Sequence, residues 1–275
     1  MTINQQTGLY GVLGFPLTHT LSPVMHNAAL TALGLNDVYL ALETKDITAA
    51  MTGVRALGIK GLSVTIPYKS EVIPLLDEVD SLATNIGAVN TIVNREGRLL
   101  GYNTDAWGAL AALEEVISIG HRTRCLVIGA GGAARAVGFA LQTKGAGVII
   151  VNRSPDKGQA LARDLNCDFL PWAEEDRAEA EVIIQTTPVG MYPDIDNCPV
   201  PESVLRPGLT VMDIIYNPWE TKLLGLAKSR GCRVINGLPM FIHQGGAQLR
   251  LWTDLEPPLA LMRATVEAAL GVGRH

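Results

Sequence analysis

A glycine-rich turn in the middle of the chain constrains the fold more than any other feature of the sequence. Residues 125–128 form an apolar run that enters the turn, and a predicted helix follows it to about Lys144. The turn consists of Gly129, Ala130, Gly131, Gly132, Ala133 and Ala134. Glycines let backbone N–H groups approach a pyrophosphate, and the start of the following helix favours its negative charge. A strand, a glycine-rich turn and a helix in this order are typical of a dinucleotide-binding domain, with a tight turn that binds no ligand as the alternative.

The residues after the next predicted strand, 148–151, indicate which dinucleotide is bound. Proteins that bind NAD place an acidic residue here, which hydrogen-bonds the ribose 2′-hydroxyl. This chain has Asn152, Arg153 and Ser154 instead, with Lys157 one helical turn further on. Arg153 offers a 2′-phosphate a planar fork of donors, and Lys157 adds a second positive charge. The sequence therefore predicts NADP as the cofactor; the alternative is that both cations are solvated surface charges.

Strands and helices alternate along all 275 residues, which predicts an α/β fold with mostly parallel sheets. Further predicted strands and buried runs are at residues 9–14, 61–66, 88–93, 182–184 and 209–215. Two helices have clear starts, one with Ser22 as its N-cap and Pro23 as its first residue, and one at Pro155. Gly34 is the predicted stop of the first of these helices.

The pattern restarts near residue 124, and this divides the chain into two predicted domains. The first is an N-terminal α/β domain at residues 1–105. The second is a doubly wound Rossmann domain at residues 106–237. We assign the C-terminal helices, residues 238–275, back to the first domain.

Charge and cysteine content exclude several classes of function. The chain has 22 Lys and Arg against 27 Asp and Glu, whereas proteins that grip nucleic acid or an anionic membrane normally carry a basic excess. Residues 1–36 contain no Asp, Glu, Lys or Arg, but glycines and prolines interrupt them, so we expect neither a targeting segment nor a membrane span. The four cysteines lie far apart without a C-x-x-C motif, which favours a reducing cytoplasm over disulfides or a zinc site.

Polar clusters interrupt the otherwise apolar first domain. Thr20 and Ser22 precede a predicted helix, so hydroxyls and helix N–H groups converge where an anion could bind. Thr65 lies at a strand end, with Lys69 just beyond it. Further polar groups come from Asn90, Asn103, Thr104 and Asp105. Each has a purely structural alternative, in which Ser22 is only an N-cap, Lys69 a surface lysine and Asp105 a helix cap.

Together, these segments carry a family resemblance. In chain order, the motifs are GFPLTHTLSP, SVTIPYK, GAVNT, GYNTD, GAGGAAR, NRS, TTPVGM, DIIYNP and GLPMFIHQGG. The sequence resembles the shikimate/quinate dehydrogenase family over nearly its whole length. So many motifs in family order are strong evidence, although no single one would be.

The resemblance implies a role for each matched residue. Lys69 and Asp105 match the catalytic pair of the family. Thr20 and Ser22 match the pair of hydroxyls that binds the substrate carboxylate, and Tyr216 matches the tyrosine that assists them. The residues that match those holding the ring hydroxyls are Thr65, Asn90 and Gln244. The matches to the NADP site are Gly129, Ala130, Gly131, Gly132, Ala133, Ala134, Asn152, Arg153, Ser154, Lys157, Thr187, Ile214, Gly237 and Met240.

The implied activity is that of an NADP-dependent shikimate dehydrogenase, an oxidoreductase of chorismate and aromatic amino-acid biosynthesis. It reversibly reduces the ring ketone of 3-dehydroshikimate to shikimate with NADPH. Lys69 can supply positive charge and a proton to the developing alkoxide, and Asp105 would hold its ammonium group in place. No metal is required, and the five histidines show no ligand spacing.

Two alternatives remain, a quinate/shikimate dehydrogenase of broader substrate range and a non-catalytic NADP-binding sensor. Retention of Lys69 and Asp105 disfavours the sensor, because a sensor needs no proton donor. We expect a small-molecule substrate, no nucleic-acid or membrane partner, and either a monomer or a homodimer.

Three positions depart from the family pattern. Ser63 and Gln185 each replace an asparagine, and we expect both changes to affect local backbone hydrogen bonding. Thr20 replaces a serine of the substrate carboxylate pair. Its extra methyl group would crowd the ring carbon that bears the carboxylate, where quinate has an additional hydroxyl. Thr20 therefore favours shikimate over quinate.

Overall fold

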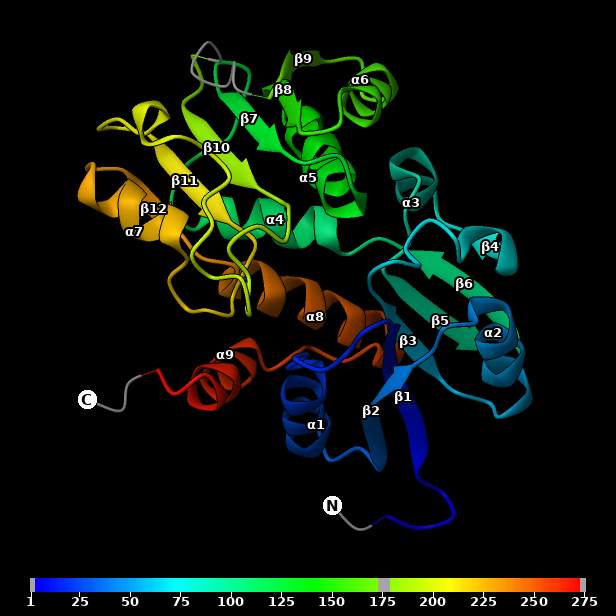
Figure 1. Cartoon of the computed structure of the whole chain (residues 1–275). Coiled ribbons are helices and arrows are strands. Elements are labelled where there is room, and N and C mark those ends of the chain that lie inside the picture. Colours follow the sequence, from blue (N-terminus) through cyan, green and yellow to red (C-terminus); the bar gives the residue numbers. More distant parts are fainter. Residues whose placement is uncertain (1–2, 173–178, 273–275) are drawn as a thin grey trace. The chain divides into compact units, whose positions relative to one another are not determined.

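The computed structural model describes residues 3–172 and 179–272 (Figure 1). The chain divides into two compact units. The first unit is Met1–Thr104 together with Gln244–His275, and the second is Asp105–His243. Within the described ranges, each unit contains one six-stranded sheet. The division after His243 falls inside helix α8 (Leu238–Thr253), so this helix contributes residues to both units.

The first sheet has the strand order β2-β1-β3-β5-β6-β4. Its strands are β1 (Gly8–Gly14), β2 (Asp37–Glu43), β3 (Gly61–Val64), β4 (Glu78–Val79), β5 (Thr91–Arg95) and β6 (Arg98–Tyr102). β1 pairs in parallel with β2 and β3, and β4 with β6, whereas β5 runs antiparallel to β3 and β6. The β5–β6 hairpin turns at Glu96 and Gly97, which have φ values of 54° and 89°, as a tight turn between twisted strands requires.

Two predicted strands of this sheet have different ends in the structure. The strand predicted at 61–66 ends at Val64, because Pro67 has no N–H with which to continue the ladder. The strand predicted at 88–93 begins only at Thr91, since the preceding backbone bonds to the loop after β3. The prediction of mostly parallel pairing is confirmed, with β5 as the antiparallel exception.

The helices of the first unit begin and end at identifiable residues. They are α1 (Ser22–Ala32), α2 (Ile47–Ala56), α3 (Ser81–Ile86), α9 (Leu259–Ala269) and the second part of α8. The prediction that Ser22 caps α1 is wrong, because the N-cap is Leu21 and Ser22 is the first helical residue. The Ser22 hydroxyl instead accepts a hydrogen bond from Thr20. Gly34 follows the end of α1 with a φ of 70°, in agreement with its predicted role as the stop.

The two faces of the first sheet are covered by different helices. On one face, Met51 and Val54 of α2 pack with Leu62, Val64 and Ile92 of the strands. On the other face lie α1 and the first-unit part of α8, and α1 packs against α9. The rings gathered on that face belong to Tyr10, His26, Tyr39 and Trp252.

The second sheet is parallel throughout, with the order β12-β11-β10-β7-β8-β9. Its strands are β7 (Arg124–Ile128), β8 (Gly147–Asn152), β9 (Asp168–Pro171), β10 (Val182–Gln185), β11 (Thr210–Asp213) and β12 (Arg233–Ile235). Counted from β7, this is the order 3-2-1-4-5-6 seen from its other end, which defines the Rossmann fold. The Rossmann prediction for the second half of the chain is therefore confirmed.

Helices pack on both faces of the second sheet, as the continuous burial along its central strands requires. They are α4 (Asp105–Glu114), α5 (Gly132–Thr143), α6 (Pro155–Asp164) and α7 (Lys222–Ser229). Cys125 and Val127 of β7 point toward the core that contains α4, α5 and α6. Leu126 and Ile128 point toward the opposite core, which contains α7. Among the described residues, no helix is both long enough and apolar enough to cross a membrane.

His26 in α1 is a fully buried titratable side chain of the first unit. It has no exposed surface, and its ring stacks on that of Tyr39 with centroids 4.4 Å apart. Burial disfavours the charged imidazolium and lowers the pKa of His26 to about 3. The sequence suggested a packed histidine, and the structure shows His26 packed against Tyr39 and Trp252.

Acidification is expected to destabilise the chain through His26. Below pH 6.5 the unfolded imidazole binds a proton that the folded one does not, so stability falls as the pH drops from about 6.5 to about 3. Between pH 7.5 and pH 5, His26 should cost about 2 kcal/mol of unfolding free energy. Urea unfolding of the wild type and His26→Phe at both pH values measures this, because the variant lacks the titrating group. Equal losses in the two proteins would contradict the assignment.

Candidate active site

The first sheet brings several loops to one edge. Because β5 runs antiparallel to β3 and β6, its amino end lies beside the carboxyl ends of those strands and of β1. The backbone continues this arrangement beyond the strands, where Val64 N donates to Asn90 O at 2.8 Å and Asn90 N donates to Tyr102 O at 3.1 Å. Most of the first-domain residues singled out in the sequence leave the sheet at this edge. They are Thr20, Ser22, Thr65, Lys69, Asn90 and Thr104.

Thr20 and Ser22 form a pair of hydroxyls at the start of α1. Thr20 Oγ1 donates to Ser22 Oγ at 3.2 Å, and Ser22 N donates to Thr20 Oγ1 at 3.3 Å. Ser22 is buried and Thr20 is half-buried. The N-cap residue Leu21 has no side chain that caps α1, so the Val24 N–H, the positive end of the helix dipole and the two hydroxyls together suit an anion.

Thr65 and Lys69 flank a turn that follows β3. Tyr68 N donates to Thr65 O at 3.0 Å, and the Tyr68 hydroxyl donates to Thr44 O at 2.9 Å. The backbone oxygen of Lys69 accepts from Val89 N at 2.7 Å. These bonds fix the half-buried Lys69 next to the segment that carries Asn90.

The side chain of Asn90 is buried and held on both sides of its amide. Its Oδ1 accepts from Thr91 Oγ1 at 2.8 Å and from Thr104 N at 2.7 Å. Its Nδ2 donates to Thr104 Oγ1 at 3.0 Å. Asn103 ties the same loop down, because its Nδ2 donates to Ala88 O at 2.9 Å. Two neighbouring strands therefore determine where the Asn90 amide points.

Helix α8 brings a second amide toward this edge. Gln244 is half-buried, and Gln248 lies one turn further along the same helix face. Gln248 Nε2 donates to Asn90 O and to Thr91 Oγ1, both at 3.1 Å. Gln248 was not predicted from the sequence, where only its spacing of four residues from Gln244 could have indicated it.

Ser63 acts differently from its prediction, whereas Gln185 acts as predicted. The expected backbone role of Ser63 is wrong, because its hydroxyl bonds to the side chains of Tyr39 and Gln248. Gln185 ends β10 and does bond the backbone, with Nε2 donating to Val189 O at 3.0 Å and Thr187 N donating to Oε1 at 3.1 Å. Gln185 thus shapes the loop that carries Thr187.

In the second unit, the glycine-rich turn adopts the conformation that a pyrophosphate site needs. Gly129 has a φ of 122°, and a Cβ there would lie 2.5 Å from Thr186 Oγ1. Gly131 is the N-cap of α5 and has open space around its Cα, with no side chain capping the helix. The N–H groups of the first turn, from Gly132 to Ala134, can therefore meet an anion at the favourable end of the helix dipole.

Arg153, Ser154 and Lys157 are exposed just beyond the carboxyl end of β8. Asn152 holds this turn, because its Nδ2 donates to Ser154 O at 2.9 Å. In a doubly wound sheet, ligands bind at the carboxyl ends of the strands. The two cations are therefore at the end of the sheet where the adenosine half of a dinucleotide would lie.

The remaining predicted cofactor residues of the second unit lie on two segments that pack closely. Gly237 N donates to Ile215 O at 3.0 Å, and a Cβ on Gly237 would lie 2.1 Å from Ile214 O. Tyr216 stacks on Phe241 with ring centroids 4.5 Å apart. Met240 is buried in the same core as the start of α5. Only glycine at position 237 permits this approach.

A buried carboxylate, Asp213, organises the loop that carries Ile214 and Tyr216. Its Oδ1 accepts from Ile215 N at 3.0 Å and its Oδ2 accepts from Thr221 Oγ1 at 2.8 Å. Burial raises the pKa of Asp213 to about 7, and the two hydrogen bonds oppose this rise. An acidic residue that ends a buried strand was the available signal for it in the sequence.

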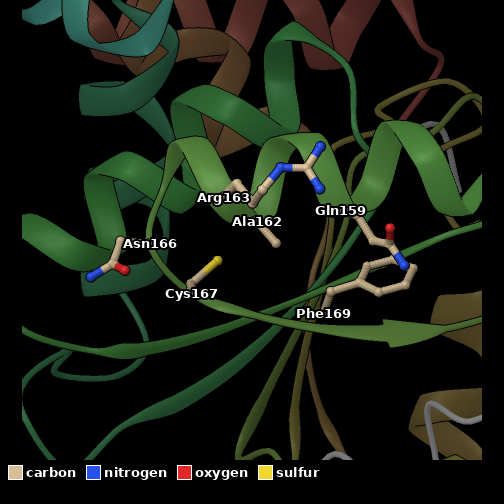
Figure 2. A pocket seen from close by; sticks show the side chains of 6 residues that line it. All are labelled: Gln159, Ala162, Arg163, Asn166, Cys167 and Phe169. Carbon is tan, nitrogen blue, oxygen red and sulfur yellow. The ribbon is translucent and has the colours of Figure 1, made fainter.

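A pocket of about 300 Å³ lies elsewhere on the second unit, where α6 ends and β9 begins (Figure 2). Its lining residues are Gln159, Ala162, Arg163, Asn166, Cys167 and Phe169. The pocket is at the amino end of the sheet, opposite the end at which doubly wound sheets bind nucleotides. Burial raises the pKa of the Cys167 thiol to about 11, which disfavours its thiolate form. Residues 3–172 and 179–272 contain no group of three His, Cys, Asp or Glu that could hold a metal ion.

A Rossmann domain in one chain with a unit that presents hydroxyl, amide and ammonium groups is typical of a nicotinamide-dependent oxidoreductase. Family models match most of the chain. The shikimate dehydrogenase substrate binding domain matches residues 12–92, shikimate/quinate 5-dehydrogenase matches 112–191, and the shikimate 5′-dehydrogenase C-terminal domain matches 237–267.

Individual relatives cover almost the whole chain. The shikimate dehydrogenase (NADP(+)) of Moorella thermoacetica is 45% identical over 282 residues, which cover 98% of this chain and 96% of the relative. Shikimate 5-dehydrogenase from Thermus thermophilus, solved in complex with NADP(H) and shikimate, is 38% identical, covers 96% of this chain and 100% of that one, and has a TM-score of 0.89. Quinate dehydrogenase from Corynebacterium glutamicum, in complex with NAD, is 34% identical. The match covers 95% of this chain and 99% of that one, with a TM-score of 0.88. The chain belongs to the shikimate/quinate dehydrogenase family.

Removing the charge of Asp213 is expected to change how stability depends on pH. Between pH 4 and pH 7 the folded carboxyl holds a proton that the unfolded one releases, so stability falls as the pH rises through this range. Asp213→Asn keeps the acceptor for Ile215 N and removes the titration. Relative to the wild type, the variant should gain about 3 kcal/mol of unfolding free energy between pH 5 and pH 8. Urea unfolding at both pH values checks this, and parallel pH dependences would contradict it.

Proposed function

We propose that the chain catalyses the reversible reduction of 3-dehydroshikimate to shikimate with NADPH, a step of chorismate and aromatic amino-acid biosynthesis. The observation that carries the proposal is the gathering of a hydroxyl pair, an ammonium group and an ordered amide at one edge of the first sheet. A ring acid with several hydroxyls and one carboxylate needs these partners. Relatives above 40% identity are shikimate dehydrogenases (NADP(+)), which points to the same reaction.

Thr20 and Ser22 bind the substrate carboxylate in this proposal. Their hydroxyls are 3.2 Å apart at the start of α1, where the Val24 N–H and the helix dipole favour a negative charge. Tyr216 assists them, and Thr65, Asn90 and Gln244 hold the ring hydroxyls. An arginine is not needed, because donors of the backbone and the hydroxyls share the charge.

Lys69 and Asp105 are the proposed catalytic pair. When NADPH is bound, its nicotinamide supplies a hydride to the carbonyl carbon of the substrate. The C=O electron pair then moves to the oxygen, and the Lys69 ammonium group stabilises that charge and donates the proton. Asp105 is buried at the first residue of α4, and its carboxylate orients the ammonium group. In the oxidative direction, Lys69 takes the proton back.

The fit of the second unit to NADP rests on the backbone of the glycine turn and on two cations. The uncapped start of α5 and the close approach at Gly129 suit a pyrophosphate. Arg153 and Lys157 supply charge for a 2′-phosphate, with Asn152 and Ser154 shaping the turn. Thr187, Ile214, Gly237 and Met240 complete the proposed site toward the nicotinamide.

The second candidate function is a quinate/shikimate dehydrogenase of broader range, which the similarity to the Corynebacterium quinate dehydrogenase favours. Thr20 argues for shikimate, because its methyl group would lie near the carboxylate-bearing carbon that carries an extra hydroxyl in quinate. A non-catalytic sensor has no use for Lys69 and Asp105.

A reducing cytoplasm is the proposed location. All four cysteines are free thiols, and burial raises the pKa of Cys125 to about 12. A small-molecule substrate is the proposed partner, and both a monomer and a homodimer are compatible with the proposal.

Replacing Lys69 by alanine is expected to lower kcat by roughly 10²–10⁴-fold, the usual contribution of a positioned acid–base group. KM for shikimate should change little, because Lys69 acts mainly in the transition state. Absorbance of NADPH during shikimate oxidation measures both constants. Lys228→Ala on α7 is the matched control and should behave as the wild type. A Lys69→Ala enzyme with near wild-type kcat would refute the assignment.

Arg153 is expected to set the preference for NADP over NAD. Two charge-assisted contacts to the 2′-phosphate, from Arg153 and Lys157, together correspond after solvent screening to a preference of roughly 10²–10³-fold in kcat/KM. Arg153→Ala should lose most of this preference and leave the kinetics with NAD+ nearly intact. Arg163→Ala, at the other end of α6, is the control and should retain it. Equal activity of the wild type with both cofactors would overturn the NADP assignment.

A further inference from the structure

A continuous chain of side-chain hydrogen bonds runs through the first unit to Asn90. The Tyr39 hydroxyl donates to Ser63 Oγ at 2.6 Å, and Ser63 Oγ donates to Gln248 Oε1 at 2.7 Å. Gln248 Nε2 donates to Thr91 Oγ1 at 3.1 Å, and Thr91 Oγ1 donates to Asn90 Oδ1 at 2.8 Å. The five residues come from β2, β3, α8, β5 and the residue before β5, and all are buried.

The chain of bonds has a single direction, which Gln248 enforces. Its Nε2 also donates to the backbone oxygen of Asn90 at 3.1 Å. A flipped amide would place Oε1 against that carbonyl, so that two acceptors faced each other in a buried site. The Ser63 hydroxyl, which already accepts from Tyr39, would then face the amide NH₂ and lose the acceptor for its own proton. Only this orientation of Gln248 gives hydrogen bonds to Ser63, Thr91 and the Asn90 backbone oxygen together.

The donor-to-acceptor direction of these hydrogen bonds extends to Asn90. Its Oδ1 accepts from Thr91 Oγ1 and from Thr104 N. Turning the Asn90 amide over would place its NH₂ against the Thr104 N–H and against the hydroxyl proton that Thr91 donates. Gln248 donates to Thr91 and so directs the Thr91 proton away from itself, toward Asn90 Oδ1 at 2.8 Å or Thr104 Oγ1 at 3.2 Å. Gln248, acting through Thr91, and the Thr104 N–H thus fix the Asn90 amide together.

We propose that Gln248 is a positioning residue for the substrate, which acts through Thr91 to hold the Asn90 amide in the orientation that meets a ring hydroxyl. The inference rests on the proposed function, in which Asn90 binds the substrate. Gln248 also anchors α8 to β5 one helical turn beyond Gln244, the other amide assigned to the ring hydroxyls. Ser63, which departs from the family pattern, is the link that connects Gln248 to β2.

Gln248→Leu removes the donors and the acceptor while keeping a side chain of similar length. It should raise KM for shikimate about tenfold and leave KM for NADP+ within twofold of the wild type. Trp252→Phe is the matched control. Trp252 Nε1 also connects α8 to β5, by donating to Ile92 O at 2.9 Å, but this bond is not one of the hydrogen bonds that lead to Asn90. Trp252→Phe should lower the melting temperature and leave KM for shikimate unchanged. If both variants raise KM equally, Gln248 serves only to hold the helix in place.

Gln248→Glu adds a readout that a structural role would not move. The ionised carboxylate cannot donate to Thr91, whereas the protonated acid can, so the KM excess over the wild type should shrink as the pH falls from 8 to 5.5. The excess of Gln248→Leu should not change with pH. If Gln248→Leu does not fold, Ser63→Ala interrupts the same series of hydrogen bonds and should raise KM for shikimate about threefold. If the wild type does not oxidise shikimate, the proposed function is refuted. If the wild type is active but none of these variants raises KM for shikimate, the positioning role of Gln248 is refuted.

Discussion

The reversed direction of β5 is the constraint on which the proposed site depends. In a purely parallel sheet, the segment before each strand lies at the edge opposite the loops that follow its neighbours. Because β5 runs antiparallel to β3 and β6, the segment that leads into it meets the loops that leave those strands. Asn90 therefore lies among Thr65, Lys69 and Thr104, although it precedes its strand and they follow theirs. One inverted strand collects these polar groups while the apolar faces of the sheet remain covered by helices.

The second unit brings its loops together at one edge of the sheet without an antiparallel strand. All its strands are parallel, so every carboxyl end lies at one edge, and the loops there need only be close to one another. Two glycines make this closeness possible, since side chains at Gly129 and Gly237 would collide with Thr186 and with the backbone of Ile214. The carboxyl group of Asp213 fixes the loop that carries Ile214, because it accepts hydrogen bonds from the Ile215 N–H and the Thr221 hydroxyl. Dinucleotide recognition of this kind is carried largely by backbone, which explains why small residues dominate its motif.

The sequence was most informative where local chemistry decides structure. The glycine turn, β7, β8, α5 and α6 follow from apolar runs and from residues with restricted backbones, and the structure has them as predicted. Strand ends in the first sheet were less predictable, because the start of β5 depends on bonds to residues after β3 that lie about 20 positions away. Ser22 resembles an N-cap in sequence, yet its hydroxyl is taken by Thr20. The role of Ser63 could not be predicted either, since its partners are 24 and 185 positions distant.

The link between Ser63 and Gln248 spans 185 positions, and it has a consequence for synthesis on the ribosome. The first unit is discontinuous, and its sheet edge is completed only by residues from the last part of the chain. The Rossmann unit is one continuous stretch and can fold as soon as it leaves the exit tunnel. The part of the molecule made first is thus expected to be finished last. Until α8 emerges, the buried hydroxyls of Tyr39 and Ser63 lack the amide that completes their hydrogen bonds, and the nascent sheet face is the surface that chaperones would need to shield.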